Sequence, residues 1–138
     1  MEIREVIFRG KRADSGEWVE GDLLQIKYYN KPIIECKIMP QIPVSCVYGV
    51  LAETIGQYTG LTDRNGKRIF EGDICKFKRF NDVHVGKVVF NVTTASFIMW
   101  YQPIVGAYGE KATQKMLLSV CDYIEIIGNI HDNPELLE

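Results

Sequence analysis

The sequence predicts a mainly β protein, α+β with little helix, whose strands are antiparallel. Along the chain, alternation of apolar and polar residues outnumbers helical periodicity. Turns containing glycine, proline or asparagine separate short runs rich in Val, Ile, Phe, Tyr and Trp. A length of 138 residues with 46% hydrophobic side chains is typical of one ordinary folded domain. We therefore expect a single domain over residues 1–138.

The first predicted element is a β-hairpin. Residues 18–29 are rich in strand-favouring side chains, and the turn residues 30–32, Asn-Lys-Pro, separate them from a second run. In residues 34–38, isoleucine and cysteine alternate with glutamate and lysine, so one face is apolar and the other polar. These runs predict an N-terminal β subdomain.

Two prolines follow this hairpin. Pro40 and Pro43 interrupt strand pairing, because proline has no backbone N–H to donate. If the domain has two subdomains, we expect their seam near residues 40–56.

The densest cluster of turn residues is the run 56–74, which four glycines punctuate. Asn65-Gly66 is the pair best able to hold positive φ at both centres of a type I′ turn, which predicts a tight reversal over residues 63–68. The run lacks the glycine spacing of a phosphate-binding loop and the ligand spacing of an EF-hand. We interpret it as backbone architecture without a cofactor.

Three adjacent antiparallel strands are predicted after this run, over residues 73–80, 83–91 and 97–101. Pro103 and two later glycines indicate a loop. Residues 115–120 fit either a helical turn or another strand, and the pattern leaves both open.

The C-terminal part carries a last strand over residues 124–127. Asn133, Pro134 and Glu135 provide a capping residue, a proline suited to the first helical position and an early acid. They predict a short C-terminal helix.

A weak internal repeat links residues 17–23 with residues 68–74, since both contain two apolar residues, then Glu-Gly-Asp, then another apolar residue. The pattern suits a chain that bends sharply at glycine and enters a strand, with carboxylates bonding nearby backbone amides. Glu-Gly-Asp-Ile before alternating strands also resembles the start of a small SH3-like barrel, which we expect in the second half. A paired-carboxylate active site is the alternative.

Two long segments, residues 56–74 and 124–137, resemble the signature of the YopX-like proteins, and residues 8–12 and 16–24 resemble their common opening. The resemblance implies a β-rich accessory protein of phages and prophages, and it supplies no assigned activity or catalytic residue. The residues that carry the structural signature are Gly56, Gln57, Tyr58, Thr59, Gly60, Asp63, Asn65, Gly66, Glu71, Gly72, Asp73, Gly128, Asn129, Asn133 and Pro134.

Charge is unevenly distributed, although the net charge of −2 and the pI of about 5.7 argue against nucleic-acid binding through bulk charge. Six basic residues lie within residues 64–79, whereas residues 122–138 hold five acids and no Lys or Arg. This pattern fits an ordinary solvated surface, head-to-tail contact between subunits, or a patch for an anionic partner.

The leading functional hypothesis is a non-enzymatic binding or self-assembly module, because no nucleophile–base pair, metal spacing or nucleotide loop stands out. We expect a homo-oligomer or a complex with an unknown phage or host protein. Four aromatic residues could anchor such an interface, and the alternative for each is a place in the core: Trp18, Trp100, Tyr101 and Tyr108.

Two alternatives remain open. In the first, the basic segment 64–79 binds nucleic acid, with possible contacts from Lys76, Lys78, Arg79 and Phe80. In the second, a hydrolase uses carboxylates from the two repeats with a histidine as acid or base: Glu20, Asp22, Glu71 or Asp73 with His84 or His131.

The cysteines and the N-terminus indicate the compartment. The cysteines are widely spaced, which predicts reduced thiols packed as small apolar groups and no metal site: Cys36, Cys46, Cys75 and Cys121. No run reaches the ~18 apolar residues of a membrane span, and the start lacks the layout of a signal peptide. We expect a cytoplasmic protein without a membrane partner or cofactor.

Overall fold

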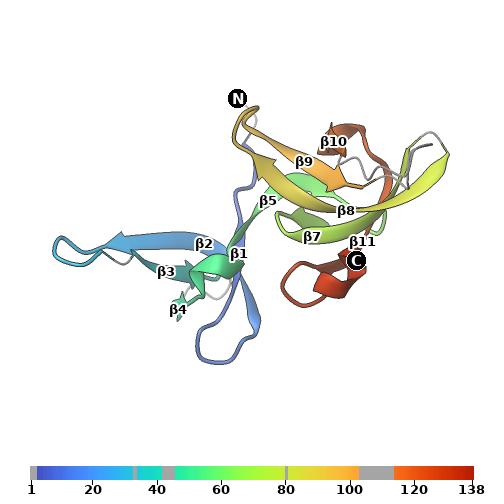
Figure 1. Cartoon of the computed structure of the whole chain (residues 1–138). Helices are drawn as coiled ribbons and strands as arrows, with labels where there is room; N and C mark the ends of the chain where they lie inside the picture. The colour runs from blue at the N-terminus through green and yellow to red at the C-terminus, as the bar shows by residue number, and fades with distance from the viewer. Residues whose placement is uncertain (1–2, 33, 42–45, 80, 103–113) are drawn as a thin grey trace. The chain divides into compact units, whose positions relative to one another are not determined.

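The computed structural model describes residues 3–32, 34–41, 46–79, 81–102 and 114–138 (Figure 1). In these residues the regular structure is antiparallel β with short 3-10 helices, and no α-helix occurs among them. The prediction of a mainly β protein with little helix is therefore confirmed. The chain divides into two compact units, Met1–Gly60 and Leu61–Glu138, and this division lies later in the sequence than the seam expected near 40–56.

In the first unit the strands follow the order β4-β3-β2-β1-β5. The predicted hairpin is present, since β2 and β3 pair antiparallel with Leu23 opposite Ile38. Ile38 is fully buried, and it packs with Cys36 and Val50 in the core of this unit. The elements are β1 (Phe8–Lys11), β2 (Trp18–Lys27), β3 (Ile34–Met39), β4 (Tyr48–Gly49), η1 (Ala52–Thr54) and β5 (Gly56–Thr62), whose last two residues belong to the second unit.

The second unit contains a five-stranded sheet with the order β10-β9-β8-β7-β11. As predicted, β7, β8 and β9 are consecutive antiparallel neighbours. The segment left open between strand and helical turn contains both, β10 followed by η2. The elements are β6 (Arg68–Phe70), β7 (Asp73–Arg79), β8 (Asp82–Asn91), β9 (Ser96–Tyr101), β10 (Gln114–Leu117), η2 (Leu118–Val120), β11 (Asp122–Asn129) and η3 (Pro134–Leu137).

The five-stranded sheet is open, so the predicted SH3-like barrel is not confirmed. Among the described residues β10 and β11 form the two edges of the sheet and do not pair with each other. The pairing of β11 with β7 is also interrupted by two register shifts, so β11 follows its neighbour irregularly.

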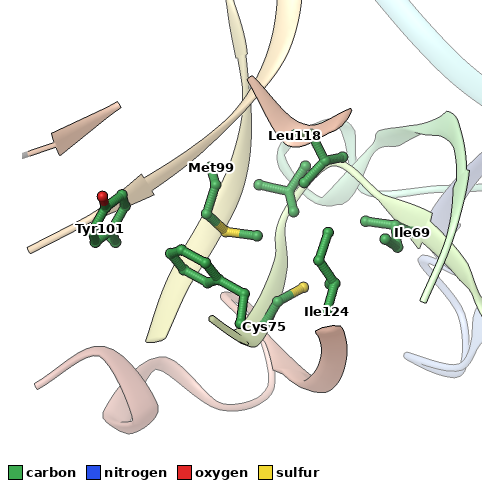
Figure 2. Packing of buried hydrophobic residues seen from close by; sticks show 8 residues of the cluster. Ile69, Cys75, Met99, Tyr101, Leu118 and Ile124 are labelled. Carbon is green, nitrogen blue, oxygen red and sulfur yellow. The ribbon is translucent and has the colours of Figure 1, made fainter. Parts of the chain in front are cut away.

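The core of the second unit lies on one face of this sheet. Alternation along the strands places Cys75 and Phe77 of β7, Val88 of β8, and Met99 of β9 on the same face. Each of these four is at most 1% exposed, and burying such a side chain stabilises the fold by ~1.5–3 kcal/mol. Figure 2 shows Ile69, Leu118 and Ile124 packed against this cluster. We call this the inner face and the opposite one the outer face.

The last helix starts as predicted at Pro134, but it is a single 3-10 turn. Asn133 occupies the predicted N-cap position but makes no side-chain cap hydrogen bond. Its Oδ1 instead accepts a hydrogen bond from the backbone N–H of Asn129 at 3.3 Å. Gly128 permits this approach, since a Cβ there would lie 2.6 Å from that oxygen.

Candidate functional site

The turn after β5 is organised by Asp63, which is only 6% exposed. Its Oδ1 accepts hydrogen bonds from the backbone N–H groups of Asn65 and Lys67, both at 2.9 Å, and its Oδ2 accepts one from Ile126 at 3.1 Å. Burial raises the pKa of this carboxyl, but the three N–H donors together outweigh it and hold the pKa below the ordinary value. Asp63 therefore joins this turn to β11.

The predicted type I′ turn is wrong in its details. Only Gly66 has positive φ, at 81°, whereas Asn65 does not. Asp63 N–H donates to Lys67 O, and Gly66 N–H donates to Asp63 O, which is the pattern of a three-residue hairpin loop ending in a left-handed glycine. The side chain of Asp63 stabilises this longer loop from inside, and dipeptide preferences do not include that contribution.

The second turn of the signature connects β6 with β7. Gly72 has a φ of 93°, and its backbone groups bond to Val88 O and Ile130 N–H. Asp73 is 1% exposed, and its Oδ2 accepts a hydrogen bond of 2.7 Å from the N–H of Phe70 across this turn. Gly56, Gln57, Tyr58, Thr59 and Gly60 lie in β5, before these turns.

The C-terminal signature residues also bond to the backbone. Asn129 Oδ1 accepts hydrogen bonds from the N–H groups of His131 at 3.0 Å and Asp132 at 2.9 Å. Together with Asn133, which bonds back to Asn129, this side chain shapes the turn between β11 and η3. The side chains of Asp63, Asp73, Asn129 and Asn133 therefore stabilise turns by accepting hydrogen bonds from backbone N–H groups.

The outer face of the five-stranded sheet presents a different chemistry. Lys76 and Lys78 are exposed there, opposite Val85 and Val83 of β8, whereas Phe77 between them is buried in the core. This agrees with the alternation expected from the sequence. Lys87 lies on the same face, opposite Trp100 of β9, and its Nζ lies 3.9 Å from the centre of the indole ring.

A groove of about 460 Å³ opens on this outer face, where the C-terminal segment adjoins β8 and β9. Apolar and polar side chains both line it, and its charged residues are Lys87 and Glu138. The Trp100 indole N–H is buried and has no hydrogen-bond partner in the part of the chain that the structure describes. The lining residues that matter here are Val83, Val85, Lys87, Trp100, Leu136 and Leu137.

The residues expected to contact nucleic acid do not all lie on the same face of the sheet. Lys76 and Lys78 point to the outer face, whereas Arg79 donates a 2.7 Å hydrogen bond to the Tyr101 hydroxyl. Phe80 lies outside the described residues. Lys78 Nζ lies 5.0 Å from the ring centre of Tyr123, an exposed residue of β11.

The residues expected for a hydrolase come from both units. Glu20 and Asp22 lie in the first unit, whereas Glu71 and Asp73 lie in the second. The His84 ring packs between Phe77 and Tyr101 at centroid distances of 5.7 and 5.0 Å. Across the described ranges, no three His, Cys, Asp or Glu side chains gather as a metal ion would require.

The cysteines fit the expectation only in part. Cys36 and Cys75 pack in the two cores as predicted, but Cys46 is exposed. Burial raises the pKa of Cys121 to about 11. At neutral pH this thiol therefore stays protonated and is a poor nucleophile.

The aromatic residues expected as interface anchors differ in their surroundings. Tyr101 is 4% exposed and belongs to the core. Trp18 lies beneath the charged groups of Arg9 and Lys11, at 4.9 and 5.5 Å from its ring centre. Tyr108 lies outside the described residues.

The groove itself was missed by the sequence reasoning. Val83, Val85 and Lys87 alternate along β8, so a shared outer face could have been inferred from that strand alone. That Leu136 and Leu137 line the groove could not have been inferred from the sequence, because it depends on the path of the chain after the turn at Asn129.

Comparison with solved structures identifies a chain with the same fold. The crystal structure of protein EF1440 from Enterococcus faecalis matches with a TM-score of 0.55 and 23% identity, covering 99% of this chain and 100% of that chain. No curated protein matches the sequence. Among the described residues, no helix is long and apolar enough to cross a membrane.

The family assignment rests on the sequence profile of the YopX protein family, which matches residues 7–138. This span contains the second unit, the first unit from residue 7 on, and every signature residue named above. The chain therefore belongs to the YopX protein family.

Proposed function

We propose that this protein is a non-enzymatic binding module whose ligand site is the groove on the outer face of the second unit. The observation that carries the proposal is the groove itself, in which valine and leucine side chains lie around an indole covered by the Lys87 ammonium, with Glu138 as the acidic residue of the lining. Such sites are typically apolar with few polar groups that fix the orientation of a ligand. A ligand with an aromatic or apolar body and an anionic group suits it.

The described surroundings of the candidate catalytic groups support a role without catalysis. Asp73 bonds to the backbone of its own turn, and the Cys121 thiol has a raised pKa. His84 lies between two aromatic rings. We regard the hydrolase as the weaker alternative.

The dye 8-anilinonaphthalene-1-sulfonate tests the groove, because it combines aromatic rings with one sulfonate. We expect dye fluorescence to rise on addition of the protein, and Val85→Glu and Lys87→Glu to weaken dye binding at least tenfold. The matched control is Val92→Glu, since Val92 is 83% exposed and does not line the groove. Equal dye binding by all four proteins, with unchanged thermal unfolding, would refute the site.

We also propose that the module acts in the cytoplasm as a phage or prophage accessory protein and that it self-associates. The family resemblance supports the first part. The second rests on the polarised charge, with basic residues concentrated in 64–79 and acids in 122–138. Light scattering at several concentrations tests self-association, and a strictly monomeric species would remove it.

A further inference from the structure

We propose that the outer face of the second-unit sheet binds single-stranded nucleic acid. Lys76, Lys78 and Lys87 would contact phosphates, and Trp100 would stack on a base. This inference rests on the proposed function, since it names the ligand class of the same face and groove.

The charge of the three central strands favours a polyanion. Their outer positions hold three lysines and no carboxylate: Ile74, Lys76 and Lys78 of β7; Val83, Val85, Lys87, Val89 and Asn91 of β8; Ser96, Ile98 and Trp100 of β9. Ile74 and Ile98 are buried at one end, so the open part is the end that carries Lys76 and Lys78.

Acidic residues lie at the borders of this area. Asp122 and Glu125 of β11 are opposite Lys78 and Lys76, and Glu138 lines the groove at its C-terminal side. A nucleic-acid strand is therefore expected to follow β7, β8 and β9 and to meet β11 only at Tyr123, beside Lys78. Phosphate contacts by a few lysines make such binding salt-dependent.

The aromatic residues favour a single strand over a duplex. Trp100 is half-buried in the groove, and its ring already holds a cation, so a base that displaces the ammonium finds an aromatic face on which to stack. Tyr123, 65% exposed with a φ of 52°, offers a second ring beside Lys78. Unpaired bases can stack on such rings, whereas bases in a duplex already stack on one another.

The test is fluorescence anisotropy with labelled 15-nucleotide single strands of DNA and of RNA and with the corresponding duplex, at 50 and 200 mM salt. We expect single strands to bind at low salt and to weaken as salt rises. The double variant Lys76→Ala/Lys78→Ala should bind at least tenfold more weakly and show a shallower salt dependence, by about 1.4 in logarithmic slope for two lost phosphate contacts. The matched control Lys27→Ala/Lys31→Ala removes two exposed lysines from the first unit and should change neither.

Stacking is tested separately. Trp100→Leu should weaken single-strand binding about fivefold to a hundredfold while the salt dependence stays as in the wild type, because stacking involves no phosphate. Thermal unfolding identifies any variant that fails to fold, and Lys87→Gln then tests the same groove with a smaller change.

The outcomes separate this inference from the proposed function. Absence of single-strand binding at low salt, or binding of the duplex as tightly as the single strand, would overturn the inference, while dye binding in the groove would preserve the broader proposal. Equal weakening by the two double-lysine variants would also overturn it, since the outer face would then have no special role.

Discussion

The two Glu-Gly-Asp segments have nearly the same sequence pattern and different structures. In residues 18–23 the chain continues through Gly21 inside β2, and Asp22 is exposed. In residues 69–74 the chain turns at Gly72, whose φ is 93°, and Asp73 is buried. The predicted sharp bend is confirmed in the second segment and wrong in the first.

The difference shows that one glycine can be required for two physical reasons. At Gly21 the requirement is space, because a Cβ would overlap the backbone carbonyl of Met39 at the end of β3. At Gly72 the requirement is the backbone conformation, since positive φ is unfavourable for residues with a Cβ. The two aspartates also differ in their contacts. Asp73 is buried and accepts a hydrogen bond across its turn, whereas Asp22 is exposed in a strand that does not turn.

The largest expected effect on stability is the difference between replacing Asp73 and replacing Asp22. Asp73→Ala should lower the free energy of unfolding of the second unit by about 2–4 kcal/mol, because it leaves the buried N–H of Phe70 without the acceptor at 2.7 Å. Asp22→Ala should change the stability of the first unit by no more than about 0.5 kcal/mol, since its bond to Gln41 is exposed. Urea unfolding followed by circular dichroism measures both.

Asp73→Asn refines this comparison. The asparagine keeps an acceptor oxygen at the same place, so it should retain part of the stability that alanine loses. Equal losses for Asp22→Ala and Asp73→Ala would show that the two segments are equivalent and that the turn does not depend on its carboxylate.

The two glycines provide the second test. Gly21→Ala and Gly72→Ala should each cost about 1–3 kcal/mol, the first through overlap with backbone atoms and the second through strain. Asparagine distinguishes the causes, because it tolerates positive φ better than alanine. Gly72→Asn should therefore be more stable than Gly72→Ala, as measured by thermal unfolding.

At position 21 the order should reverse. A larger side chain makes the overlap with Met39 and Pro40 worse, so Gly21→Asn should be less stable than Gly21→Ala. If asparagine were better than alanine at both positions, backbone conformation would explain both glycines and the distinction would fail.

Much of the fold could be predicted because strand pairing depends on local alternation. The β2–β3 hairpin and the β7–β8–β9 meander follow from runs whose side chains alternate and whose connections are short. Closure of the sheet could not be predicted in this way. It depends on whether the edge strands β10 and β11 meet, and no local pattern encodes that pairing.

The candidate site also has one part that the sequence predicts and one part that it does not. Alternation correctly separated Lys76 and Lys78 from the buried Phe77. The groove depends instead on Leu136 and Leu137, which approach β8 only because the Asn129 and Asn133 side chains shape the preceding turn. Contacts between distant segments of this kind are tertiary, and sequence spacing does not reveal them.

The smallest expected effect extends the comparison to a third aspartate, Asp63, which also closes a turn. Burial alone would raise its pKa. The hydrogen bonds from the backbone N–H groups of Ile126, Lys67 and Asn65 together lower the pKa by more than burial raises it, so the folded pKa lies below the ordinary value of 3.8. A depressed folded pKa contributes stability that is present above the unfolded pKa and is lost as the pH falls through the folded pKa. Stability of the second unit should therefore decline below about pH 4.

Asp63→Asn isolates this contribution, because it has no charge to lose. It should cost about 1 kcal/mol at pH 7, because its single acceptor oxygen cannot replace both Oδ1, which serves Asn65 and Lys67, and Oδ2, which serves Ile126. Its urea midpoint should fall less steeply between about pH 5 and 2.5 than that of the wild type. Asp14→Asn is the control, since that exposed carboxylate pairs with Arg12 in the first unit and closes no such buried turn. Parallel pH profiles for the wild type and Asp63→Asn would show that the buried turn draws no stability from the charge of its aspartate.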